Sequence, residues 1–174
     1  MQSKAFTALR SIAAATAISL GLISSAFSHG DHAPHPGKQP EVSPLATLQL
    51  EEARQATARY LDVDAAVADG YVDIGAFVPG MGWHYLKSSI VDNRYSATRP
   101  ELLVYADDPC GGKRRLVAVE YAIPLELSKR APQGFVGHSD RWDANHELGL
   151  WTLHAWIWEY NPDGVFAPFN SRVP

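Results

Sequence analysis

The sequence predicts an α+β domain in which an N-terminal helix packs on a mostly antiparallel β-sheet or a small barrel. Two observations carry this prediction. A helical pattern runs from Ser43 toward Asp69, and from Tyr71 onward short runs rich in Val, Ile, Tyr and Trp are separated by clusters of Gly, Pro, Asp and Asn. The helical pattern comes first in the chain, so the helix is expected to cover one face of the sheet.

The predicted helix has clear start and stop signals. Ser43 can accept a hydrogen bond from a free backbone amide, and Pro44 fits the first helical position, where its missing N–H costs nothing. Gly70 supplies the stop. The apolar positions on one broad stripe of this helix are Leu45, Leu48, Ala53, Ala56, Tyr60 and Val63.

At least five strands are expected after the helix. The clearest are Gly82 to Leu86, Leu102 to Ala106, Leu116 to Ile123 and Leu150 to Tyr160, with a closing strand at Val165 to Pro168. The Gly-rich stretch Asp107 to Lys113 predicts a hairpin between the second and third of these strands. Two further segments are expected to form helical turns, Pro124 to Arg130 and Asp140 to Glu147.

The first 28 residues have the pattern of a cleavable signal peptide. Lys4 and Arg10 form a short positive head, Ser11 to Phe27 carries no charge, and small residues precede a cleavage site before His29. The sequence therefore predicts a secreted or periplasmic protein with no membrane segment after cleavage. Residues 29–42 are rich in His, Pro and Gly and predict a flexible lead, and residues 43–174 predict a single domain.

Charge and cysteine content narrow the function classes. The formal net charge is −4. The charged residues of the predicted signal peptide are all basic, so the mature chain is more acidic still. Its basic cluster at residues 113–115 is too small for a nucleic-acid footprint, which excludes that partner class. Cys110 is the single cysteine and cannot form an internal disulfide, so packing must supply the stability. A turn residue with an incidental thiol is the favoured interpretation of Cys110.

Three ionisable residues stand in apolar strands. They are His84, Glu120 and His154, each in a different predicted strand. If the strands converge, two imidazoles and a carboxylate predict a site for a divalent transition metal. The alternative is that they are hydrogen-bonded structural residues or face solvent. The tight His-x-His pair of cupin-like sites is missing.

Aromatic residues beside these positions predict a ligand pocket, lined by Trp83, Tyr85, Trp156 and Trp158. A second polar cluster, expected to be a solvated connection rather than a catalytic or metal site, comprises His138, Asp140, Asp143, His146 and Glu147. In the lead, secondary metal capture is predicted for His29, His32 and His35, because clustered imidazoles bind Cu(II), Ni(II) or Zn(II).

Three motifs stand out along the chain: Gly80-Met81-Gly82-Trp83-His84-Tyr85, Val119-Glu120-Tyr121, and the segment from His154 to Phe166 with its Asn161-Pro162-Asp163-Gly164 turn. Together they resemble the motifs of a widespread family of exported bacterial proteins of uncharacterised activity. The similarity covers roughly residues 51–173. It implies one α+β domain and directs attention to His84, Glu120 and His154, but it implies no activity.

Three functions follow as hypotheses. The first is a non-enzymatic binding protein that holds a small molecule or a metal in the pocket around His84, Glu120 and His154. The second is a metal-dependent enzyme that uses the same residues, with the metal as Lewis acid or oxygen activator. The third is a structural or homo-oligomeric protein in which the tryptophans form core or subunit contacts. The sequence does not identify the ligand or the metal.

Overall fold

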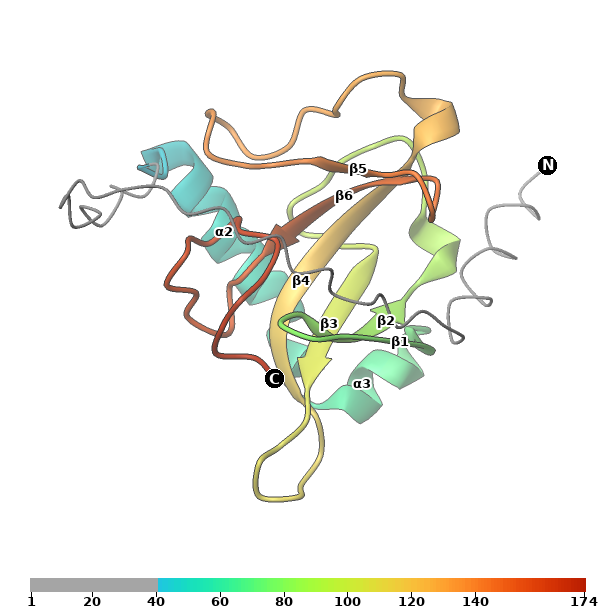
Figure 1. The fold of residues 1–174 in the computed structure, drawn as a ribbon, viewed down its shortest axis with the longest axis vertical. Coiled ribbons are helices and arrows are strands. Elements are labelled where there is room, and N and C mark those ends of the chain that lie inside the picture. Colours follow the sequence, from blue (N-terminus) through green and yellow to red (C-terminus); the bar gives the residue numbers. More distant parts are fainter. Residues whose placement is uncertain (1–40) are drawn as a thin grey trace, which may run out of the picture.

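The structure of this protein is a computed structural model that describes residues 41–174. The predicted signal peptide, residues 1–28, lies outside the described residues, as do His29, His32 and His35. The fold is α+β: helical segments come first and a six-stranded antiparallel sheet follows (Figure 1). Within the described part of the chain, no helix is long and apolar enough to cross a membrane.

The predicted helix begins where its start signals place it but is broken before its end. Helix α2 spans Pro44–Thr57, a 3-10 turn spans Ala58–Leu61, and helix α3 spans Val63–Ala68. Ser43 Oγ accepts from the Ala46 amide at 3.0 Å, as expected for a helix cap. Asp62 is extended and its side chain accepts from the Asp64 amide, so it caps a new helix and explains the break.

The apolar stripe of α2 is only partly buried. Ala53 and Tyr60 belong to the main core, as predicted, but Leu45 and Leu48 are 58% and 60% exposed. The buried residues of α2 itself are small, Ala46, Ala53 and Thr57. Small side chains let the helix lie close to the sheet, which leaves the two leucines beyond its contact surface. Gly70 ends the helical region with φ +95°, as expected.

The sheet is open, so the alternative of a small barrel is wrong. Its strands are β1 (Val72–Val78), β2 (Gly82–Leu86), β3 (Leu102–Ala106), β4 (Arg115–Pro124), β5 (Asp143–Asn145) and β6 (Leu150–Ala155). Their order is β1-β2-β3-β4-β6-β5, and all neighbours are antiparallel. The edge strands β1 and β5 do not pair with each other in this order, so the sheet does not close.

The predicted hairpin is confirmed by the pairing of β3 with β4, but the C-terminal predictions need correction. Strand β6 ends at Ala155 rather than Tyr160, because the Trp156 amide bonds to Val165 O and the next residues turn away. Residues 165–168 form turns rather than a strand, and residues 143–145 form the short strand β5 rather than a helical turn. A helical turn does occur at Leu125–Leu127, within its predicted segment.

The two faces of the sheet are covered differently. One face carries Tyr85, Leu103, Tyr105, Val119, Tyr121 and Leu153, which belong to the same core cluster as buried residues of α2. In Figure 1, α2 crosses behind β4. The opposite face, called here the site face, carries two smaller apolar clusters. His84, Glu120 and His154 lie between these clusters along the strands.

Candidate metal centre

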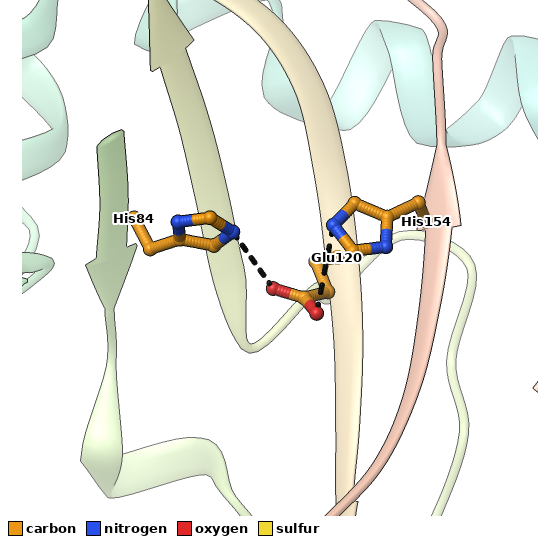
Figure 2. Close-up of side chains that lie close together, drawn as sticks. All are labelled: His84, Glu120 and His154. Carbon is orange, nitrogen blue, oxygen red and sulfur yellow. Dashed lines mark ion pairs between the residues drawn. The ribbon is translucent and has the colours of Figure 1, made fainter. Parts of the chain in front are cut away.

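The three predicted ligands lie on the site face of three strands. Glu120 of β4 is directly opposite His154 of β6, and His84 of β2 lies one strand further away, opposite Val104 of β3. Side chains alternate between faces along a strand, and the register brings all three to the same face. Figure 2 shows the carboxylate of Glu120 between the two imidazole rings. The convergence predicted from the sequence is therefore present.

The ligand atoms form a compact group. His84 Nε2 lies 3.5 Å from Glu120 Oε2, and His154 Nε2 lies 3.6 Å from Glu120 Oε1 (Figure 2). One ligand atom from each residue can be chosen so that no two are more than 4.8 Å apart. A tetrahedral metal with bonds of about 2.0–2.2 Å separates its ligands by about 3.3–3.6 Å. Small side-chain movements would therefore bring all three onto one ion.

The orientation of His84 is fixed by a bulge in β1. Asp73 pairs with Tyr85 and Phe77 pairs with Trp83, so the three residues 74–76 stand opposite the single residue His84. The bulge places the carbonyl oxygen of Ala76 at 3.1 Å from His84 Nδ1. A carbonyl oxygen only accepts, so Nδ1 carries a proton and donates it. Nε2 then faces Glu120, which is the arrangement found for metal-binding histidines.

Two glycines make this arrangement sterically feasible. Gly75 lies inside the bulge with φ +70°, a conformation that side chains disfavour. Gly82 begins β2 with φ +115°, and a Cβ atom there would clash with the carbonyl oxygen of Tyr105. Gly82 thus lets β2 approach β3 closely two residues before His84. Both glycines serve the position of the same imidazole.

His154 has a polar atom that lacks a partner in the described structure. Its Nε2 is buried and makes no hydrogen bond with residues 41–174. Burial lowers the pKa of His154 below its ordinary value, against the opposing attraction of the Glu120 carboxylate. Burial therefore favours the neutral ring, in which one of the two nitrogens offers a lone pair. A buried ring nitrogen without a hydrogen-bond partner is costly, and a metal ion beside Nε2 would remove that cost.

The surroundings of the group are apolar. His84, Glu120 and His154 are 6%, 6% and 5% exposed. One flanking cluster includes Val104, Ala118 and Trp156, and the other includes Leu102 and Ala122. The Trp156 indole lies nearly parallel to the His154 ring, with centroids 6.3 Å apart, and its N–H bonds to Ala167 O at 2.6 Å. The ligands are thus packed as firmly as core residues.

The four predicted pocket aromatics are not brought together. Trp156 alone lies beside a ligand on the site face. Trp83 and Tyr85 flank His84 in β2 and point to the other face, where Arg114 lies 3.9 Å from the Trp83 ring centroid. Trp158 follows the end of β6 and donates to Thr57 Oγ1 of α2 at 3.1 Å. The strand prediction extended β6 too far, so it placed Trp158 on the wrong face.

The second polar cluster does not gather three metal-binding side chains in the described structure. His138 is exposed and lines a surface pocket of about 390 Å³ together with Asp140 and Trp142. Burial raises the pKa of Asp140. Asp143, His146 and Glu147 are exposed in and after β5. Among the described residues, only the His84, Glu120 and His154 group gathers three metal-binding side chains. Cys110 is a free, exposed thiol in the turn after β3.

Sequence reasoning did not single out Glu101 as a functional residue. It directly precedes β3, is 2% exposed, and its Oε2 accepts from the Ala122 amide at 3.1 Å. Burial raises the pKa of this carboxyl to about 8. A charged residue immediately before the apolar run of β3 was the available signal. The backbone partner Ala76 O was also missed, because periodicity gives no sign of a bulge.

Comparisons with known proteins gave no match to a family model, to a curated protein or to a solved structure. The resemblance to exported bacterial proteins therefore stays a prediction. The function has to be argued from the geometry of the site.

Proposed function

We propose that this protein is an exported domain that binds one divalent transition metal ion through His84, Glu120 and His154. The observation that carries the proposal is the buried cluster of two imidazoles and one carboxylate, whose ligand atoms all lie within 4.8 Å of one another. Imidazole nitrogen with carboxylate oxygen is a donor set suited to Zn(II), Cu(II), Ni(II) or Fe(II). The predicted signal peptide supports export.

A purely structural role explains the same geometry less well. If His84 and Glu120 formed a charged hydrogen bond, their atoms should lie about 2.7–2.9 Å apart. The observed separation is 3.5 Å, and that to His154 is 3.6 Å. These nitrogen–oxygen distances are too long for good hydrogen bonds. They match the distances of about 3.3–3.6 Å between two ligand atoms on one tetrahedral metal ion. Metal-binding histidines usually donate their other ring N–H to a carbonyl or carboxylate oxygen. The hydrogen bond from His84 Nδ1 to Ala76 O fits this pattern.

The test is elemental analysis of the full exported chain, purified without an added His tag. We expect about one metal ion per chain, lost in His84→Ala and in His154→Ala. His146→Ala removes an exposed histidine and is the matched control, which should keep its metal. A variant in which His29, His32 and His35 are all replaced by Ala separates lead-bound metal from metal at the strand site. Metal content unchanged in both ligand variants would refute the proposal.

The second candidate function is a metal-dependent enzyme. It is favoured by the count of protein ligands, since structural zinc sites are closed by four and catalytic sites keep three with an open position. The described residues supply three. A water or substrate molecule bound at that open position would be activated by the metal, and the binding site would then be catalytic.

A further inference from the structure

The charge of the proposed ligand set does not cancel that of a divalent ion. This step rests on the proposed function. Glu120 supplies one negative charge, and the two histidines bind as neutral rings. His84 keeps its Nδ1 proton because that nitrogen donates to Ala76 O. A divalent ion with these ligands therefore leaves one net positive charge at a buried position.

The residues around the ligands do not neutralise this charge. On the site face, Glu120 has Ala118 and Ala122 as its neighbours along β4, and both are fully buried. Val104 and Leu102 lie on the same face of β3, the strand between His84 and Glu120, and they too are buried and apolar. Thr152, the next residue of β6 on this face, is polar but uncharged. Asp143 of β5 pairs with Thr152 and acts on His154 electrostatically, but it is exposed and lies 4.0 Å from Arg141, so solvent and that guanidinium screen its charge. An uncompensated charge in such surroundings is costly.

The three ligands also leave coordination incomplete. Glu120 directs Oε2 toward His84 and Oε1 toward His154, so its carboxylate stands between the imidazoles (Figure 2). If each residue supplies one donor atom, a tetrahedral ion held by these residues has a fourth position without a ligand from residues 41–174. The same ion therefore lacks both a ligand and a negative charge.

We infer that the bound metal takes one small monoanion from solution as its fourth ligand. The required ligand carries a single negative charge on a compact donor group. Hydroxide from water meets this requirement when no other anion is present, and small carboxylates and azide meet it too. The crowded apolar site face selects for small size. Binding is a ligand exchange: the incoming anion replaces bound hydroxide or water, and the oxidation state of the metal does not change.

The test uses the full chain loaded with Co(II), whose visible absorption reports its ligands. Sodium azide is titrated in, with sodium perchlorate as a weakly coordinating control at equal ionic strength. We expect a saturable change in the cobalt bands with azide, at one azide per cobalt, and no change with perchlorate. Stoichiometrically bound cobalt whose bands ignore azide would overturn the inference and leave the proposed function standing. Failure to bind cobalt in the strand site would count against the proposed function itself.

A pair of variants tests the charge argument separately. Val104 lies opposite His84, so Val104→Asp places a carboxylate beside the centre, and Val104→Asn places a neutral group of similar shape there. The aspartate should keep cobalt bound and abolish the azide response, whereas the asparagine should retain the response. A response that persists in folded, cobalt-loaded Val104→Asp would contradict the charge argument. If Val104→Asp does not fold by circular dichroism, the titration of the unaltered chain decides.

Discussion

If the protein binds a metal as proposed, Glu120 should have opposite effects on its metal-free and metal-bound forms. Without a cation, Oε2 faces His84 Nε2, which offers a lone pair because the proton is on Nδ1, and Oε1 lies 3.6 Å from His154 Nε2, too far for a good hydrogen bond. Glu120→Gln replaces one oxygen by an NH₂ group that can donate to His84 or His154. We expect this variant to stabilise the metal-free fold by about 1 kcal/mol, measured by urea unfolding in the presence of a chelator. A structural carboxylate would give the opposite sign.

The same substitution should weaken metal binding. Outer partners of metal ligands already contribute about 10–100-fold in affinity, so loss of a direct, charged ligand should cost at least about 100-fold. Competition with a chromophoric chelator measures the affinity. The exposed carboxylate variant Glu147→Gln is the control and should bind metal normally. Equal affinities in Glu120→Gln and the unaltered chain would exclude Glu120 as a ligand.

Glu101 predicts a pH dependence of stability that is independent of the metal. Its folded-state pKa is raised from 4.5 to about 8 by burial. The folded protein therefore holds a proton that the unfolded chain has released, so the contribution of Glu101 to stability is greatest below pH 4.5 and falls as pH rises toward 8. The slope from this group reaches about 1.4 kcal/mol per pH unit inside that window.

Replacement of Glu101 by Gln removes the titrating group, so the fall in stability between pH 5 and about 8 should flatten. Urea unfolding at a series of pH values, with a chelator present, measures the slope. Glu147→Gln changes an exposed carboxylate and should keep the slope of the unaltered chain. An unchanged slope in Glu101→Gln would show that this carboxyl is ionised in the folded protein.

At the scale of elements, the β1 bulge positions His84, one of the proposed metal ligands. Gly75 has φ +70° and open space around it, so Gly75→Val introduces backbone strain without a clash. We expect the bulge to shift, the Ala76 carbonyl to leave His84 Nδ1, and metal affinity to fall about 10–100-fold. Gly111→Val is a matched control, because Gly111 also has positive φ and open space but lies in the distant β3–β4 turn. Equal affinities in both variants would show that the bulge does not support the site.

Strand alternation explains why the shared face of the three proposed ligands could be predicted from the sequence and the positions of the four aromatic residues could not. His84, Glu120 and His154 lie in strands whose apolar runs fix the local face, so their convergence needed only antiparallel pairing. Trp158 lies beyond Ala155, where the chain leaves the strand and the Trp158 amide donates a hydrogen bond to Val117 O. No residue pattern marks that turn. The helix break at Asp62 was not predicted either. A capping aspartate inside a helical pattern cannot be distinguished by sequence from an ordinary exposed residue of the helix.

At the scale of the whole molecule, the proposed metal centre would join separate parts of the sheet. Its ligands would come from β2, β4 and β6, and the carbonyl that accepts from His84 comes from β1, so an ion would tie together four of the six strands. Metal that binds only the folded state stabilises it by about 2.7 kcal/mol at a free concentration 100 times Kd. For a domain of this size, that corresponds to a rise in Tm of roughly 10 °C.

Thermal unfolding followed by far-UV circular dichroism, with and without Zn(II), measures this rise. Unfolding should remain a single cooperative transition, because the four strands share one sheet. His154→Ala should lose the dependence on Zn(II), whereas the triple alanine variant at His29, His32 and His35 should keep it, since those residues are not ligands of the proposed centre. A Tm that rises equally in His154→Ala would place the stabilising ion elsewhere on the chain.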